Sequence, residues 1–276
     1  MDPLFRIHTG LPRESPGGDV FTRQAFQLLP CLNAPRILDL GCGPGAQTLE
    51  LARLTSGPIT AVDLHAPYLE RVREAMDAHG FGHRLTCLRH DMAALPFEDE
   101  VFDLIWCEGA IYCIGFAEGL RRWRRLLAPG GFLVVSDLIW LRPDPPEALR
   151  AFWAEAYPGM GSLATCQAHI REAGYRPLGH LILPEPAWWN YYGPLEARLD
   201  ALDAQAAADD EALRQTIDRE RREIAMYRAY GGWYSYAFFA MQVPRPEPSP
   251  DASFTVGRSF TIGEAFHSHF LGRDRS

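Results

Sequence analysis

The chain has 276 residues, of which 47% are hydrophobic and 12% aromatic, enough to bury one large α/β core with additions. Its formal net charge of −8 argues against a nucleic acid as substrate, because a polyanion is normally held by a basic surface. No apolar run reaches the length of a membrane span, and Met1–Arg6 lack the apolar stretch of a signal peptide.

The six cysteines show neither Cys-x-x-Cys pairs nor the histidine-rich spacing of a metal site. We therefore expect reduced thiols, no bound metal and a cytoplasmic location. The only strongly basic cluster, residues 121–125, is expected to be a solvated helix face rather than a binding patch.

The first structural signals are a turn-rich stretch at 12–18 and a helical pattern at 19–30. The turn-rich stretch is equally compatible with a lid over a ligand and with a mobile leader. Strands and helices then alternate, which predicts a parallel sheet with helices on both faces. The predicted strands are 36–40, 59–63, 84–89, 101–106 and 131–139, and the predicted helices between them are 46–55, 66–79 and 116–127.

A proline-rich break at 143–146 leads into a more helical region. The apolar periodicity there predicts four helices and two strands. The helices are expected at 147–157, 162–173, 188–204 and 209–229, and the strands at 178–183 and 233–243. The proline-rich segment 244–250 is predicted to be an extended linker. Beyond it, a short repeat at 253–263 has strand-like alternation and could dock on a sheet edge, pair with a neighbour or stay disordered.

The most informative segment is Arg36–Ala46, in which an apolar strand runs into a glycine-rich turn and then into a helix. Glycine lets the backbone approach a ligand closely, and the N–H groups of a helix start favour electronegative ligand groups. The glycines also fit a degenerate dinucleotide-binding pattern. Two residues weaken that interpretation: Pro44 removes one N–H from the turn, and Asp39 places a carboxylate where an ammonium group could donate to it.

Five segments in order resemble the class I S-adenosylmethionine-dependent methyltransferases over residues 33–140. They are the glycine turn 37–45, the strand end 61–64, His90–Phe97, the strand 102–109 and the turn 126–133. Residues 108–112 and 187–192 further resemble small bacterial methyltransferases of undefined substrate. The family implies a doubly wound, Rossmann-like α/β sheet of seven strands, mostly parallel with an antiparallel last strand. Helical lid additions are expected at about 143–174 and 187–230, within a domain spanning 1–244 and followed by a tail at 245–276.

The resemblance implies that the cofactor is S-adenosyl-L-methionine and that it lies close to the backbone of the glycines in the turn. Asp39 would orient the methionine amino group through water or the turn backbone, and Asp63 would accept both ribose hydroxyls. Leu64 would pack on the adenine, while Asp91 would accept from its amino group beside the Met92 N–H. A turn-forming role is the alternative for Asp91. The cofactor-binding residues so implied are Asp39, Gly41, Gly43, Gly45, Asp63, Leu64, Asp91 and Met92.

Glu108 and Tyr112 are the candidate catalytic residues, because they follow the fourth strand, where the family holds the reactive methyl group. A carboxylate there could take a proton from the attacking group, attract an amine, or serve a structural role bonded to backbone N–H groups of the next turn. The aromatic residues of the helical additions suit a small, partly apolar or amine-bearing acceptor.

The predicted function is methyl transfer to a small molecule, by a chain that binds neither nucleic acid nor membrane and is compatible with a homodimer. A non-catalytic S-adenosylmethionine-binding protein and a nicotinamide-dependent oxidoreductase are the alternatives. An RNA or protein methyltransferase is disfavoured by the acidic balance and by the lack of an Asn-Pro-Pro-Tyr motif after the fourth strand.

Overall fold

A computed structural model describes residues 3–205 and 210–245 of the chain. By their contacts these residues belong to one compact unit, which ends at Arg245. The repeat at 253–263 and nearly all of the proline-rich linker lie outside the described residues, so the expected tail stays a prediction.

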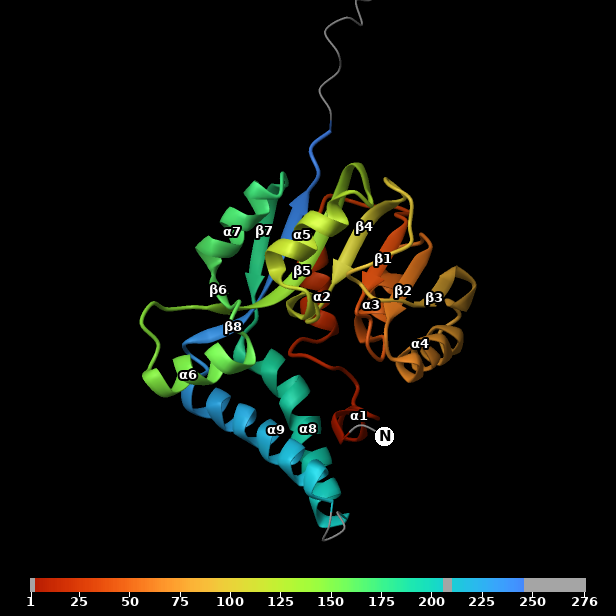
Figure 1. The fold of residues 1–276 in the computed structure, drawn as a ribbon. Coiled ribbons are helices and arrows are strands. Elements are labelled where there is room, and N and C mark those ends of the chain that lie inside the picture. Colours follow the sequence, from red (N-terminus) through yellow and green to blue (C-terminus); the bar gives the residue numbers. More distant parts are fainter. Residues whose placement is uncertain (1–2, 206–209, 246–276) are drawn as a thin grey trace, which may run out of the picture. The chain divides into compact units, whose positions relative to one another are not determined.

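The strands form one sheet in the order β3-β2-β1-β4-β5-β8-β7 (Figure 1). Strand β8 runs antiparallel to both of its neighbours, β5 and β7, and the pairs from β3 to β5 are parallel. This confirms the predicted mostly parallel sheet with an antiparallel last strand. The strands are β1 (Ile37–Leu40), β2 (Ile59–Asp63), β3 (Leu85–Arg89), β4 (Phe102–Cys107), β5 (Leu127–Trp140), β7 (Arg176–Ile182) and β8 (Tyr234–Gln242).

Three local features differ from the expectation. A two-residue strand, β6 (Gly161–Ser162), pairs with β5, so the sheet has eight strands rather than seven. Strand β5 begins at Leu127, which pairs with Phe102 before an irregularity in the β4 register, whereas the sequence placed its start at 131. Helix α1 (Pro3–His8) was not predicted. Strand β6 has two residues and helix α1 has six, and segments this short carry no periodic signal in the sequence. Strand β5 starts earlier than expected because its first residues pair with β4.

The remaining helices agree with the predicted ones within a few residues. They are α2 (Asp19–Phe26), α3 (Ala46–Leu54), α4 (Ala66–Ala78), α5 (Phe116–Arg124), α6 (Glu147–Ala156), α7 (Leu163–Glu172), α8 (Glu185–Gln205) and α9 (Glu211–Tyr230). Short 3₁₀ turns occur at η1 (Gly82–Arg84) and η2 (Ile111–Cys113). In the described residues, none of these helices combines the length and the apolar character needed to cross a membrane.

Two apolar layers sandwich the sheet, because successive side chains of a strand point to opposite faces. In β8, Phe238 packs with α2, α3 and α4, and Phe239 packs with α5 and α7 on the other face. A doubly wound sheet of this kind leaves the carboxyl ends of its parallel strands free to bind ligands.

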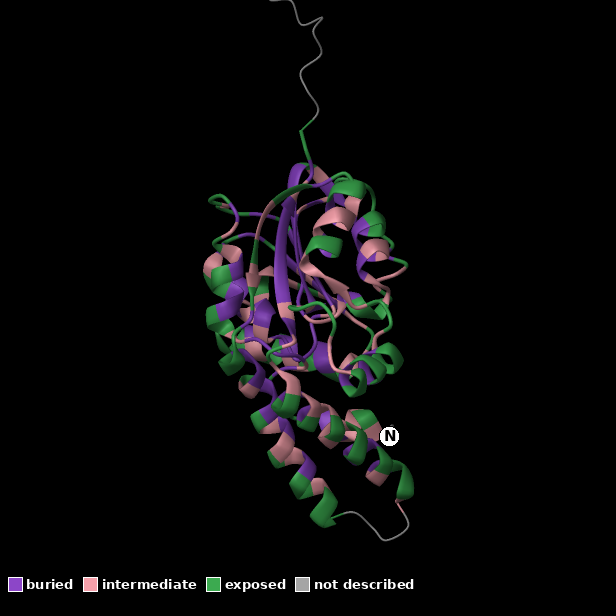
Figure 2. Cartoon of the chain, turned by 90° about the vertical axis from the view of Figure 1, so that its left-hand side faces the viewer, coloured by how far each residue is buried: buried purple, intermediate pink, exposed green. Residues whose placement is uncertain are grey.

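A group of helices lies beyond those carboxyl ends: α1, α6, α8 and α9, here called the helical cap (Figure 1). Its apolar side chains form a third core, which includes Ile7, Leu149, Trp188 and Ile217. Figure 2 shows the inner sides of these helices buried and their outer sides exposed. Helices α6, α8 and α9 fall within the predicted helical additions, and α1 joins them from the other end of the chain. Helix α7, which the prediction grouped with them, packs beside α5 on the sheet instead.

Candidate functional site

One cavity of about 1070 Å³ lies between the carboxyl ends of the strands and the helical cap. It begins at the turns after β1 and β4, which are neighbours in the sheet although far apart in the chain. This is the point where the strand order reverses, the usual ligand site of a doubly wound sheet. The cavity continues between η2 and the cap helices, where Tyr112, Tyr157 and Tyr191 line it.

The turn after β1 has the open backbone that the sequence predicted. Gly41, Gly43 and Gly45 all have positive φ angles, of 66°, 52° and 93°. A Cβ on Gly41 would lie 2.4 Å from the Cβ of Ala110, so a larger residue would push the turns after β1 and β4 apart. The glycines therefore serve both the tight turn and its close approach to the neighbouring loop.

Asp63 lies at the end of β2 and faces this turn. Its Oδ2 accepts from the Gly43 N–H at 2.9 Å, and its Oδ1 accepts from the His65 N–H at 2.8 Å. Each carboxylate oxygen can accept a second hydrogen bond, so both remain able to receive a hydroxyl. The geometry suits a ribose beside the turn, as the sequence analysis expected of Asp63.

The other predicted adenine contacts also line the cavity. Leu64 is 60% exposed and offers an apolar surface to the cavity. Asp91 accepts from the Ala93 N–H at 2.8 Å through one oxygen, and Met92 is fixed by the Trp123 indole, which donates to its carbonyl. Asp91 thus forms the turn considered as its alternative role while still facing the cavity.

Asp39 is fully buried and lies behind the cavity wall rather than in it. Its carboxyl group accepts from the Thr48 hydroxyl at 2.5 Å and from the Gln47 amide at 3.4 Å. Burial raises its pKa to about 7. Gln47 does line the cavity and also donates to the Cys42 carbonyl. Contact between Asp39 and a ligand would therefore run through Gln47 or the turn.

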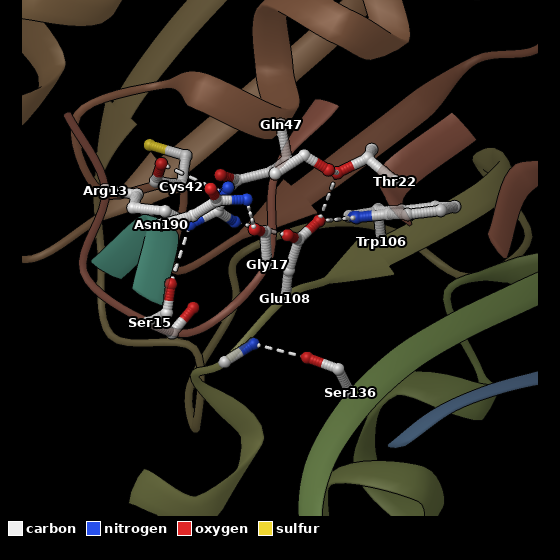
Figure 3. Close-up of polar contacts among 12 residues, drawn as sticks. Arg13, Ser15, Gly17, Thr22, Cys42, Gln47, Trp106, Glu108, Ser136 and Asn190 are labelled. Atoms are coloured by element: carbon white, nitrogen blue, oxygen red, sulfur yellow. Dashed lines mark hydrogen bonds and ion pairs between the residues drawn. The ribbon is translucent and has the colours of Figure 1, made fainter. Parts of the chain in front are cut away.

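Glu108 is buried at the end of β4, and both of its oxygens are already engaged (Figure 3). Oε1 accepts from Arg13 Nη2 at 2.7 Å, and Oε2 accepts from the Thr22 hydroxyl at 2.9 Å and the Trp106 indole at 3.3 Å. Its partners are therefore not the following turn that the sequence analysis considered; the Gly109 N–H donates to Ser136 instead. This saturation favours a positioning role over a free base.

Arg13 is the residue that sequence reasoning missed at this place. It belongs to the turn-rich stretch 12–18, which packs across the cavity instead of trailing as a leader. The Gly17 N–H donates to the Ala187 carbonyl at 2.9 Å, and Asn190 donates to the Gly17 carbonyl at 2.8 Å. Of the two alternatives for this stretch, the contacts favour the lid. A lone arginine among turn residues gives no local sign of a partner 95 residues away.

Tyr112 is 47% exposed in η2 and lies edge-on to Tyr157, with ring centroids 6.1 Å apart. The Tyr157 hydroxyl donates to Oδ2 of Asp137, a buried residue of β5, with 2.8 Å between the two oxygens. Burial raises the pKa of Asp137 to about 7. In α8, Trp188 and Tyr191 face the cavity while Trp189 turns away from it. The aromatic residues of the cap are thus divided between core and cavity, as their spacing required.

A second group that the sequence did not reveal also lines the cavity: His8, Glu14, Glu220 and Glu223, here called the acidic cluster. His8, Glu220 and Glu223 belong to cap helices, whereas Glu14 lies beside Gly43 of the glycine turn. His8 Nδ1 lies 2.6 Å from Glu14 Oε2, and the Tyr192 hydroxyl donates to Glu223 at 2.9 Å. Burial raises the pKa of Glu223 to about 7. A faint signal was available, because Glu220 and Glu223 are spaced to share one face of α9.

The residues around the cavity match a known protein family. Residues 37–131, which contain the glycine turn, Asp63 and Glu108, match the family model described as a methyltransferase domain. That match identifies this part of the chain, about a third of its length, as a methyltransferase domain.

The chain is similar to several methyltransferases over different spans. It is 28% identical over 230 residues to 27-O-demethylrifamycin SV methyltransferase from Amycolatopsis mediterranei, covering 80% of each chain. It is 30% identical over 123 residues to methyltransferase GfsG from Streptomyces halstedii, covering 44% of each. The chain spans between 25% and 60% of the length of seven other curated relatives that it matches, GfsG included.

A solved methyltransferase structure has the same fold. It is a SAM-dependent methyltransferase from Geobacter sulfurreducens in complex with S-adenosyl-L-homocysteine, with a TM-score of 0.76 and 21% identity. The match covers 88% of this chain and 98% of that one. At this identity the likeness concerns the fold alone.

The residues around the glycine turn are compatible with S-adenosylmethionine, the cofactor that the sequence resemblance implies. The positive-φ turn leaves room for a ligand, Asp63 keeps acceptor capacity on both oxygens, and Leu64 offers an exposed apolar surface. Within residues 3–205 and 210–245, no group of three or more histidine, cysteine, aspartate or glutamate side chains is arranged to hold a metal ion.

Proposed function

We propose that the protein transfers a methyl group from S-adenosylmethionine to a small-molecule acceptor. The observation that carries this proposal is one continuous cavity, which runs from the glycine turn past Glu108 to the helical cap. Its volume of about 1070 Å³ exceeds the roughly 300–1,000 Å³ of a typical site for one small ligand. The cavity therefore has room for an acceptor beside the cofactor.

The chemistry supplied by bound S-adenosylmethionine is an electrophilic methyl group, whose transfer depends mainly on in-line alignment. The chain contributes positioning: Asp63 holds the ribose, the glycine turn accommodates the methionine portion, and Leu64 covers the adenine. Glu108 fixes Arg13, and with it the lid stretch, over the end of β4. Tyr112 and Tyr157 line the acceptor end with aromatic surface.

Two alternatives are weaker on specific grounds. A nicotinamide-dependent oxidoreductase would need the turn to cradle a pyrophosphate, and Pro44 supplies no N–H to such a ligand. A non-catalytic cofactor-binding protein has no need for the cap end of the cavity, where aromatic residues and the acidic cluster meet.

Isothermal titration of the purified protein with S-adenosylhomocysteine, and with NAD as control, tests the cofactor site. We expect binding of the former alone. Asp63→Ala removes the ribose acceptor and should weaken binding about 10- to 100-fold, as expected for charge-assisted hydrogen bonds. Asp218→Ala, at an exposed position of α9, should leave the affinity unchanged. If NAD binds and S-adenosylhomocysteine does not, the proposal is wrong. Methyl transfer to a panel of amines and phenols then tests turnover.

We also propose that the protein works in the cytoplasm without nucleic acid or membrane partners, as a monomer or homodimer. All six cysteines are free thiols, which is usual in a reducing compartment. The arginines of 121–125 are engaged with neighbours; Arg122 donates to Glu118 and to the Ala93 carbonyl. Light scattering of the purified protein would establish its oligomeric state.

A further inference from the structure

The acidic cluster has more negative charge than the described residues around it can balance. Six carboxylate residues line the cavity against two arginines, and Arg13 is already paired with Glu108. The other arginine, Arg219, is exposed at the edge of the cavity. A cavity wall of this composition is complementary to a cationic ligand.

The carboxylates of α9 are held in place and face inward. Glu220 and Glu223 lie three residues apart, on one face of the helix, and their side chains line the cavity. The Glu220 side chain is only 12% exposed, and Tyr192 fixes one oxygen of Glu223. Burying carboxylates in this way is costly unless a positive partner joins them.

His8 supplies a second observation at the same place, a buried ring nitrogen without a hydrogen bond among the described residues. It is 8% exposed, and its Nδ1 is engaged by Glu14 at 2.6 Å. Its Nε2 makes no hydrogen bond within the described part of the chain, and lies 3.8 Å from Glu220 Oε2, too far for one. Glu14 Oε1 is likewise buried without a hydrogen bond to any described residue. The charged groups that face one another here are therefore Glu14, Glu220, Glu223, His8 and Arg219.

The form of the cation follows from the surroundings. The described residues offer no cluster suited to a metal ion, which disfavours a bare divalent cation. Trp188 and Tyr191 line the same end of the cavity, and aromatic faces attract organic cations. An ammonium group attached to an apolar or aromatic body can contact both the carboxylates of the acidic cluster and the aromatic side chains.

We propose that the methyl acceptor is an amine, bound in its ammonium form at the cap end of the cavity by Glu220 and Glu223. Because an ammonium nitrogen has no lone pair, it first gives one proton to a carboxylate of this pair. The neutral nitrogen then takes the methyl group as the bond between that methyl and sulfur breaks, which leaves S-adenosylhomocysteine. This inference rests on the proposed function, since it names the substrate class of the same site. The aromatic residues contact the body of the acceptor, and His8 with Glu14 completes the polar end of the pocket.

The test uses probes that share a phenylethyl body and carry a cationic, a neutral or an anionic end group. The protein loaded with S-adenosylhomocysteine is titrated with phenethylamine, 2-phenylethanol and 3-phenylpropionate, at about pH 8 so that a carboxyl group with a pKa near 7 is mostly ionised. We expect phenethylamine to bind at least tenfold more tightly than the other two. Glu220→Gln and Glu223→Gln should each weaken it by about tenfold or more, while Asp218→Asn, the same loss of charge at an exposed position of α9, should change it less than twofold.

Three results would overturn the inference. The alcohol or the acid could bind as well as the amine, or the amine could fail to bind to a folded, S-adenosylhomocysteine-loaded protein. The glutamine variants could also weaken binding of S-adenosylmethionine and leave phenethylamine unaffected, in which case the cluster serves the cofactor. Because the charge series is run on the unmodified chain, it stays decisive even if a variant does not fold. Failure to bind S-adenosylhomocysteine at all would instead refute the proposed function.

Discussion

The ion pair between Arg13 and Glu108 offers the sharpest test of how the lid stretch is held. The Glu108 side chain is 1% exposed and that of Arg13 is 8% exposed, so neither charge is solvated in the folded protein. Removing one partner of such a pair typically costs about 3–5 kcal/mol, because the other charge stays buried. After Arg13→Met, Glu108 still accepts from Thr22 and Trp106, which reduces the expected loss to about 2–3 kcal/mol.

A double-mutant cycle measures the pair itself. Arg13→Met, Glu108→Gln and their combination are compared by urea unfolding, followed through tryptophan fluorescence. We expect the double variant to be about as stable as the less stable single variant, so the coupling energy equals the cost of the milder substitution, about 2–3 kcal/mol. The matched control is the exposed pair of Arg36 and Asp103, whose side chains are 47% and 38% exposed. Its coupling should stay below about 1 kcal/mol.

The same variants decide between the two roles of Glu108. If it positions the lid, both single variants lose stability and bind S-adenosylhomocysteine less tightly. A catalytic base would give another pattern, in which Glu108→Gln abolishes turnover while Arg13→Met leaves it largely intact. Additive effects of the two substitutions on unfolding would refute the positioning argument.

Two further predictions concern the turn after β1 and the carboxyl group behind it. Gly41→Ala should lower the free energy of unfolding by about 1–3 kcal/mol and weaken S-adenosylhomocysteine binding, because this residue has a positive φ and its new methyl group would clash with Ala110. The control is Gly80→Ala. Gly80 has a φ of 78° and open space around it, so this substitution should show the backbone strain without any loss of binding. Asp39 keeps its proton up to about pH 7 when folded but releases it near pH 4 when unfolded, so its contribution to stability falls as the pH rises across this window. The unfolding free energy of Asp39→Asn should therefore depend less on pH between about 4 and 7 than that of the unmodified chain; parallel curves would contradict this.

The order of strands and the cofactor end of the site follow from short continuous segments. The strand, turn and helix around the glycines are neighbours in the chain, and their backbone requirements are local. Asp63 could be recognised because it ends an apolar strand, and parallel strands bring their carboxyl ends to one edge. For these reasons the sequence alone determined the fold class and the position of the turn.

Only the tertiary structure decided what the buried charges do. Two of the three partners of Glu108 lie 95 and 86 residues away in the chain, and no spacing rule connects such positions. The acidic cluster brings together residues of α1 and α9, which lie near opposite ends of the described sequence. A helix as short as α1 forms because it packs against other helices, since its own residues cannot stabilise it alone. The pKa of a carboxyl group is set by burial and by charges from several elements, which exist only once the helices of the cap have packed against the ends of the strands.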